Sequence, residues 1–240
     1  PTTAAPAAPA EPAPGSGALV PTPTDDVSQG PPGAFARTLL RPRPAITIVF
    51  EQMHQRGAEP AAASVAFAVD SLERVTAKAL DVSEVIALSG AARSWSADDL
   101  RTTADASGRA MQGGGRAVLR VLFVRGTFEG SDSVLGVAVR GDVLAVFSDS
   151  VAAARTPVVT GDAIEEAVLV HELGHVLGLV DLARNTGRAD KEHPGHSPNA
   201  RSVMYWAVES SLIGQVLTGP PPRQFDADDV TDLNALRNGA

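Results

Sequence analysis

The segment His171-Glu172-Leu173-Gly174-His175 contains the residues of this sequence best suited to chemistry. A spacing of four places the two imidazoles one turn apart on one face of a helix, where a single Zn²⁺ can contact both. Glu172 lies about 100° around that helix from His171, where its carboxylate can take a proton from a water beside the metal. The motif predicts His171 and His175 as zinc ligands and Glu172 as the general base.

The residues after the motif predict a third ligand. Gly178 follows His175 by one helical turn, and a glycine there lets the helix end with positive φ so that the chain turns back sharply. This turn is expected to deliver Asp181 to the metal. Three protein ligands leave the fourth position open, as in catalytic sites, whereas a closed structural site has four protein ligands.

The segment from His171 to Asp181 reads HELGHVLGLVD and resembles the metzincin pattern H-E-x-x-H-x-x-G-x-x-H/D; its final Asp is similar to that of the snapalysin branch. Further on, Ser202-Val203-Met204-Tyr205 resembles the Met-turn of that family, in which a methionine lies beneath the three ligands. The resemblance covers about Ala45 to Leu236. It implies a zinc endopeptidase that acts on polypeptide substrates. It also implies an α+β, matrixin-like fold, with a twisted mixed sheet, a long backing helix and a zinc-binding active-site helix.

The sequence departs from the matrixin pattern in two ways. Met204 lies farther beyond His175 than in compact matrixins, which predicts an inserted loop between Asp181 and the Met-turn. The chain also has no Cys, so a matrixin-type cysteine switch is excluded, as are disulfides and Cys-ligated metals.

Other polar residues near the motif have less specific contexts. His193 and His196 stand in the polar turn Glu-His-Pro-Gly-His, and we expect them to be solvated rather than to bind metal. Oxyanion stabilisation or substrate binding is the second possibility for one of them, and also for Tyr205. Asp228 and Asp229 are expected to cap or charge the first turn of the last helix, where the helix dipole favours carboxylates.

Two alternatives compete with this interpretation. One is a zincin that uses a later carboxylate, Glu192 or Glu209, in place of Asp181. The other is a non-enzymatic, zinc-stabilised binding or adhesion module. The tripeptide Arg140-Gly141-Asp142 is an integrin-binding signature, but a tight turn between two strands explains it equally.

Hydrophobic periodicity predicts the elements that position these residues. Strands are expected at 45–50, 85–88, 118–124, 134–139 and 143–147, with 134–139 as the sheet edge that faces the cleft. Capping patterns at Ser96 and Asp162 predict the starts of two helices, the second of which carries the motif and ends at Gly178. Further helices are expected at about 60–80 and 226–236, the last with Val230, Leu233 and Leu236 facing inward.

Length and composition limit the domain organisation and the partners. The 240 residues allow one medium domain with a tail, and we expect a disordered Pro/Ala-rich leader at 1–43 followed by a catalytic domain at 44–240. The net charge of -8 argues against nucleic-acid binding, and no apolar run is long enough for a transmembrane segment. Because the chain begins at Pro1 without a signal segment, we expect a cleaved export signal, a secreted or cell-surface location and a possible surface tether through the leader.

Overall fold

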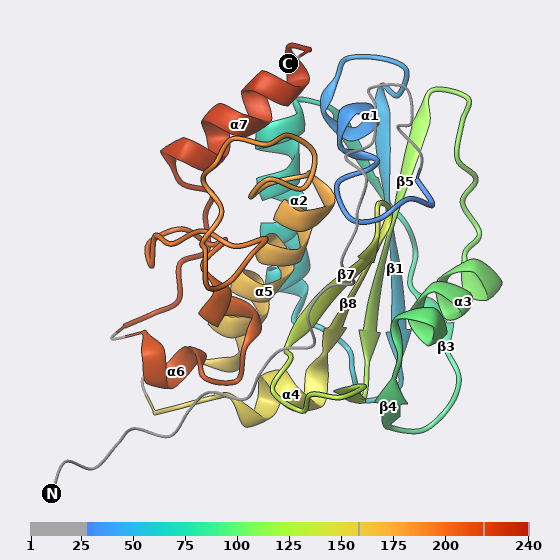
Figure 1. Ribbon diagram of the computed structural model, residues 1–240. Helices are drawn as coiled ribbons and strands as arrows, with labels where there is room; N and C mark the ends of the chain where they lie inside the picture. Colours follow the sequence, from blue (N-terminus) through green and yellow to red (C-terminus); the bar gives the residue numbers. More distant parts are fainter. Residues whose placement is uncertain (1–27, 158, 218, 240) are drawn as a thin grey trace, which may run out of the picture.

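The computed structural model describes residues 28–157, 159–217 and 219–239 (Figure 1). Its elements, in chain order, are α1 (Ala36–Leu40), β1 (Thr47–Gln55), α2 (Ala62–Thr76), β2 (Ala79–Val82), β3 (Ile86–Leu88), β4 (Arg93–Trp95), α3 (Ala97–Ser107), β5 (Arg116–Val124), β6 (Gly126–Phe128), β7 (Gly136–Arg140), β8 (Val143–Phe147), α4 (Ser148–Ala153), α5 (Gly161–Val176), the 3₁₀ helix η1 (Trp206–Glu209), α6 (Ile213–Val216) and α7 (Ala227–Arg237). Within these described residues, no helix is both long and apolar enough to cross a bilayer.

A mixed sheet forms the centre of the molecule. Its strand order is β2-β1-β5-β8-β7, with β3 also pairing with β1. All neighbours run parallel except β7, which pairs antiparallel with β8 through the predicted hairpin. The mixed sheet and the position of β7 at its edge confirm the sequence expectation.

Helices cover both faces of this sheet (Figure 1). Alternation along β5 directs Leu119, Val121 and Phe123 into a core shared with α2 and α5, while Leu122 and Val124 point into a second core shared with α3. The sheet is therefore buried on both sides, as is usual for parallel strands.

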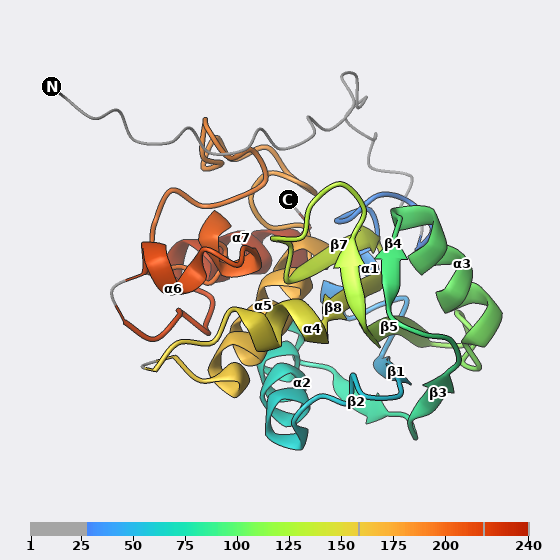
Figure 2. The ribbon, with the colours of Figure 1, turned by 90° about the horizontal axis from the view of Figure 1, so that it is seen from below.

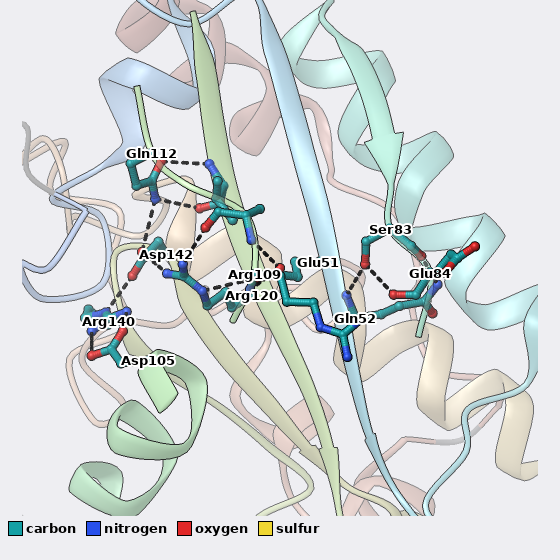
Figure 3. A network of polar contacts seen from close by, with 12 residues as sticks. Glu51, Gln52, Ser83, Glu84, Asp105, Arg109, Gln112, Arg120, Arg140 and Asp142 are labelled. Carbon is teal, nitrogen blue, oxygen red and sulfur yellow. Dashed lines mark hydrogen bonds and ion pairs between the residues drawn. The ribbon is translucent and has the colours of Figure 1, made fainter. Parts of the chain in front are cut away.

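A buried polar network ties the sheet to α3 (Figure 3). Arg120 on β5 lies between Glu51 on β1, at 3.2 Å, and Asp142 in the β7–β8 turn, at 3.3 Å. Arg140 in turn pairs with Asp142 at 2.6 Å and with Asp105 at 2.8 Å. Because Arg140 is only 5% exposed and Asp142 only 1%, the Arg140-Gly141-Asp142 tripeptide cannot serve as an adhesion surface in this structure.

Several element boundaries differ from the sequence expectation. Thr160, rather than Asp162, caps α5, because its hydroxyl accepts from the Ala163 N–H at 3.3 Å. Val230 on α7 is 40% exposed and does not face inward, whereas Leu233 and Leu236 do. The Ser96 capping box of α3 is present as predicted.

The expected boundary between the leader and the catalytic domain, at residue 43, differs from the structure. Residues 1–27 lie outside the described part of the chain, but residues 28–43 belong to the domain. Phe35, Leu39 and Leu40 on and beside α1 are buried in the same core as α2 and α5, and Gly141 donates a backbone hydrogen bond to Gly30 at 2.8 Å. The boundary at 43 is therefore corrected: a helix of five residues is too short to produce visible periodicity among the surrounding prolines.

This packing predicts that Leu39→Ala lowers the free energy of unfolding by about 2–5 kcal/mol, because it leaves a cavity in the core. Met111 is 81% exposed, so the matched control Met111→Ala should change the free energy of unfolding by less than about 0.5 kcal/mol. Urea unfolding of the three proteins measures both values. Equal stability of the Leu39 variant and the wild type would show that α1 is not part of the core.

Candidate metal centre

Helix α5 places His171 and His175 one turn apart, as their spacing predicts. Both side chains are buried, and their Nε2 atoms lie 3.0 Å apart. The other ring nitrogen of His171, Nδ1, donates a hydrogen bond to the carbonyl oxygen of Val203 at 2.7 Å. This bond fixes the tautomer that leaves Nε2 free to bind a cation. Burial beside two other imidazoles also lowers the pKa of His175 well below its ordinary value, which keeps that ring neutral.

A third imidazole, that of His196, completes the group. Its ring centroid lies 5.2 Å from that of His171 and 5.1 Å from that of His175, and the side chain is buried rather than solvated as expected. The His193–His196 turn is closed by a backbone hydrogen bond of 3.1 Å, and Ser197 donates a backbone hydrogen bond to Met204 at 2.8 Å. The sequence gives one weak signal for this position of His196, namely a Pro-Gly turn shortly before Met204.

The carboxylate of Glu209 lies among the same imidazoles. Its Oε1 is 3.0 Å from the Nε2 of His196, and its Oε2 is 3.5 Å from the Nε2 of His171. Potential ligand atoms of His171, His175, His196 and Glu209 all lie within 4.8 Å of one another. One of the two alternative carboxylates considered from the sequence, Glu209, is thus in the group, whereas Glu192 is exposed and outside it.

Asp181 is not part of this group. Gly178 does end the helix with φ +82°, as predicted, but Val180 and Asp181 also take positive φ and lead the chain into a local turn. There the Asp181 carboxylate accepts hydrogen bonds from the backbone N–H and hydroxyl of Thr186 at 2.7 and 2.6 Å. Burial raises the pKa of Asp181, but these hydrogen bonds outweigh it and bring the pKa below its ordinary value. The structure therefore gives Asp181 a loop-stabilising position and places His196 where we expected this residue.

Met204 lies directly against α5, beside Gly174. A Cβ atom added to Gly174, which separates the two histidines of the motif, would be only 2.2 Å from the Met204 sulfur. The Met204 N–H donates to the hydroxyl of Ser202 at 2.9 Å, and this hydroxyl donates to Asp229 at 2.8 Å. Helix α7 therefore supports the turn at residues 202–204 through Ser202, a role of Asp229 in addition to the predicted one at the start of the helix.

Helix α5 packs against β7 at the edge of the sheet (Figure 2). Glu172 of α5 lies at this contact, beside Gly136 of β7. It is fully buried, and a Cβ added to Gly136 on β7 would lie 3.0 Å from its Cγ and from its Oε1. Burial and the neighbouring Glu209 carboxylate raise the pKa of Glu172 well above its ordinary value, while the backbone N–H of Ala138 opposes this rise. Apart from this weak interaction with Ala138, neither carboxylate oxygen has a hydrogen-bond partner within the described residues.

These donors fit a divalent transition metal. Three imidazoles and a carboxylate form a donor set that such ions accept. Burial of two carboxylates at one place is also costly unless a cation compensates their charge. The weakly partnered oxygens of Glu172 are consistent with a site built to interact with a group other than the protein itself.

Comparison with known proteins identifies the fold. The sequence matches no protein-family model and no curated protein. Among solved structures, archaemetzincin from Methanopyrus kandleri is 17% identical, with a TM-score of 0.50 over 80% of this chain and 95% of that chain. Archaemetzincin from Archaeoglobus fulgidus (17% identity, 77% and 98% coverage) and metalloproteinase-II from Bacteroides fragilis (15% identity, 82% and 55% coverage) both give a TM-score of 0.44. The chain therefore has a mixed α/β fold similar to that of the M. kandleri archaemetzincin.

The contact between Gly174 and Met204 predicts the effect of a single methyl group. Gly174→Ala should displace the Met204 side chain and lower the melting temperature, because the added methyl would overlap the Met204 sulfur in a fully buried position. An overpacking cost of about 1–3 kcal/mol is expected. Gly219→Ala, at a position with no atom within 4 Å, is the control and should melt like the wild type. Identical melting curves for both variants would contradict the close contact.

The buried position of Asp229 predicts a pH dependence of stability. Burial raises its pKa from 3.8 to about 6 in the folded protein. Between these values the folded state holds a proton that the unfolded state has lost, so this residue's contribution to the free energy of unfolding falls as pH rises from about 4 to 6. Asp229→Asn keeps an oxygen for the Ser202 and Asp226 hydrogen bonds and does not titrate. The free energy of unfolding of the variant, relative to that of the wild type, should therefore rise by up to about 3 kcal/mol between pH 4 and 7. Urea unfolding measures it at each pH. A difference between the two proteins that does not change with pH would contradict the raised pKa.

Proposed function

We propose that this protein is a zinc-dependent peptidase that hydrolyses peptide bonds with a water molecule activated by Glu172. The observation that carries the proposal is the buried convergence of three imidazoles beside a buried glutamate at the edge of a sheet. The likeness of the fold to an archaemetzincin supports it. We propose His171, His175 and His196 as the zinc ligands, with Met204 packed beneath them.

The three histidines and Glu172 have different tasks in this reaction. His171, His175 and His196 would hold a zinc ion, which would supply the Lewis acidity that acidifies water and polarises a carbonyl group. Glu172 accepts the proton of the attacking water and passes it to the leaving amine.

Strand β7 is the proposed binding site for the substrate backbone. It is the edge of the sheet, and Gly136 and Ala138 on it face Glu172. An extended peptide can add to such an edge through main-chain hydrogen bonds, which many sequences can form. We propose polypeptides cleaved internally as the substrate class, and a secreted or cell-surface enzyme as the setting.

Replacement of Glu172 tests the catalytic role. Glu172→Ala should retain zinc, because it removes no imidazole, and should lose casein hydrolysis by several orders of magnitude. Zinc content by atomic emission and casein cleavage with and without a chelator measure the two properties. Chelator-sensitive cleavage at the wild-type rate by this variant would remove Glu172 from the mechanism.

The third ligand is tested by two variants compared side by side. His196→Ala should bind zinc about 10-fold or more weakly, since two imidazoles leave the ion under-coordinated. Asp181→Asn should keep wild-type zinc affinity, because its carboxylate is engaged with Thr186. Competition with a chromophoric chelator measures both affinities. The reverse result, with affinity lost only in the Asp181 variant, would restore Asp181 as the ligand.

A further inference from the structure

Residues 209–211, which begin at the last residue of η1, combine two contacts that point to control of the proposed site. We infer that Glu209 is a displaceable fourth metal ligand, and that the pairing of residues 209–211 with residues 133–135 holds it in place, so that the enzyme described here is in a closed, latent state. This inference rests on the proposed zinc site. It adds that substrate and water enter only after Glu209 leaves.

The first contact is that of the side chain. The two oxygens of Glu209 point to the Nε2 atoms of two different imidazoles, those of His196 at 3.0 Å and His171 at 3.5 Å. A carboxylate in that position can bind the same cation as the imidazoles. Its negative charge also offsets part of the charge of a divalent cation, which neutral imidazoles cannot do.

The second contact is that of the backbone. Leu135 donates a hydrogen bond to the carbonyl oxygen of Glu209 at 2.7 Å, and Ser211 donates one to the carbonyl oxygen of Ser133 at 2.7 Å. Val134 and Ser210 form the antiparallel bridge between these bonds. The segment thus pairs with the chain that leads directly into β7, as a short added strand would.

Together the two contacts place an internal segment where a substrate is expected. Its backbone occupies the sheet edge immediately before Gly136, and its side chain occupies the metal group beside Glu172. A closed set of four protein ligands leaves no position for water, whereas three ligands do. Release of the pairing at 133–135 would therefore open both the metal and the adjacent strand edge in one movement.

The test measures access to the metal without relying on proteolysis. The protein is loaded with Co²⁺ in place of zinc, and acetohydroxamate is titrated while the visible absorption bands of the cobalt are followed. Glu209→Ala should bind acetohydroxamate at least about tenfold more tightly than the wild type, because apparent affinity rises with the fraction of open sites. Its cobalt spectrum before titration should also differ, since one protein ligand is missing.

Two further variants make the test specific. Ser211→Pro removes the N–H that donates to Ser133 but leaves the Glu209 carboxylate intact, and the extended backbone of Ser210 is compatible with a following proline. It should also tighten acetohydroxamate binding. Glu192→Ala, which removes an exposed acid outside the metal group, is the matched control and should behave like the wild type.

The outcomes separate this inference from the proposed function. The latch is the displaceable Glu209 together with the pairing that holds it. It would be overturned if both Glu209→Ala and Ser211→Pro kept the wild-type cobalt spectrum and acetohydroxamate affinity, even if the wild type cleaves casein in a chelator-sensitive way. Tighter binding in both variants, with no cleavage of casein by any of the proteins, would support the latch and contradict the peptidase. Faster casein cleavage by Ser211→Pro than by the wild type would support both.

Discussion

Charge compensation inside a largely buried cluster is the constraint on which the rest of this structure depends. Glu172 and Glu209 are placed beside three imidazoles, and apart from the weak interaction with Ala138, Glu172 has no hydrogen-bond partner for either oxygen among the described residues. Such an arrangement is stable only if a cation or bound protons offset the negative charge. The hydrogen bond from His171 to Val203 and the packing of Met204 on Gly174 serve this centre, because they fix the side chains that a cation would contact.

Local and distant parts of the chain contribute to the centre by different means. Helix α5 needs only its own periodicity to align His171 and His175. His196 and Glu209 arrive on segments without long helices, and backbone hydrogen bonds to Met204 and Leu135 position them. The centre therefore joins one rigid helix to two short segments held by main-chain pairing.

This difference explains what could be predicted from the sequence. The helical pair His171 and His175, the edge strand β7 and the capping box at Ser96 follow from short-range patterns, and the structure contains all three. The position of His196 depends on a loop whose path is set by tertiary contacts, so a polar context suggested solvent exposure instead. Asp181 failed to join the group for the same reason: positive φ at two successive residues turned its side chain toward Thr186, which no periodicity could reveal.

The anchoring of His196 has a consequence for how this protein can change over time. Backbone bonds from Asp190 to His196 and from Ser197 to Met204 hold the histidine from both sides. Residues 182–189 lie between the end of the motif and the first of these anchors. Insertions or deletions that spare Thr186, which holds Asp181, can change the length of this stretch while His196 keeps its place, since loops tolerate such changes better than packed elements do. The loop is thus a region in which descendants of this protein can diversify without loss of the centre.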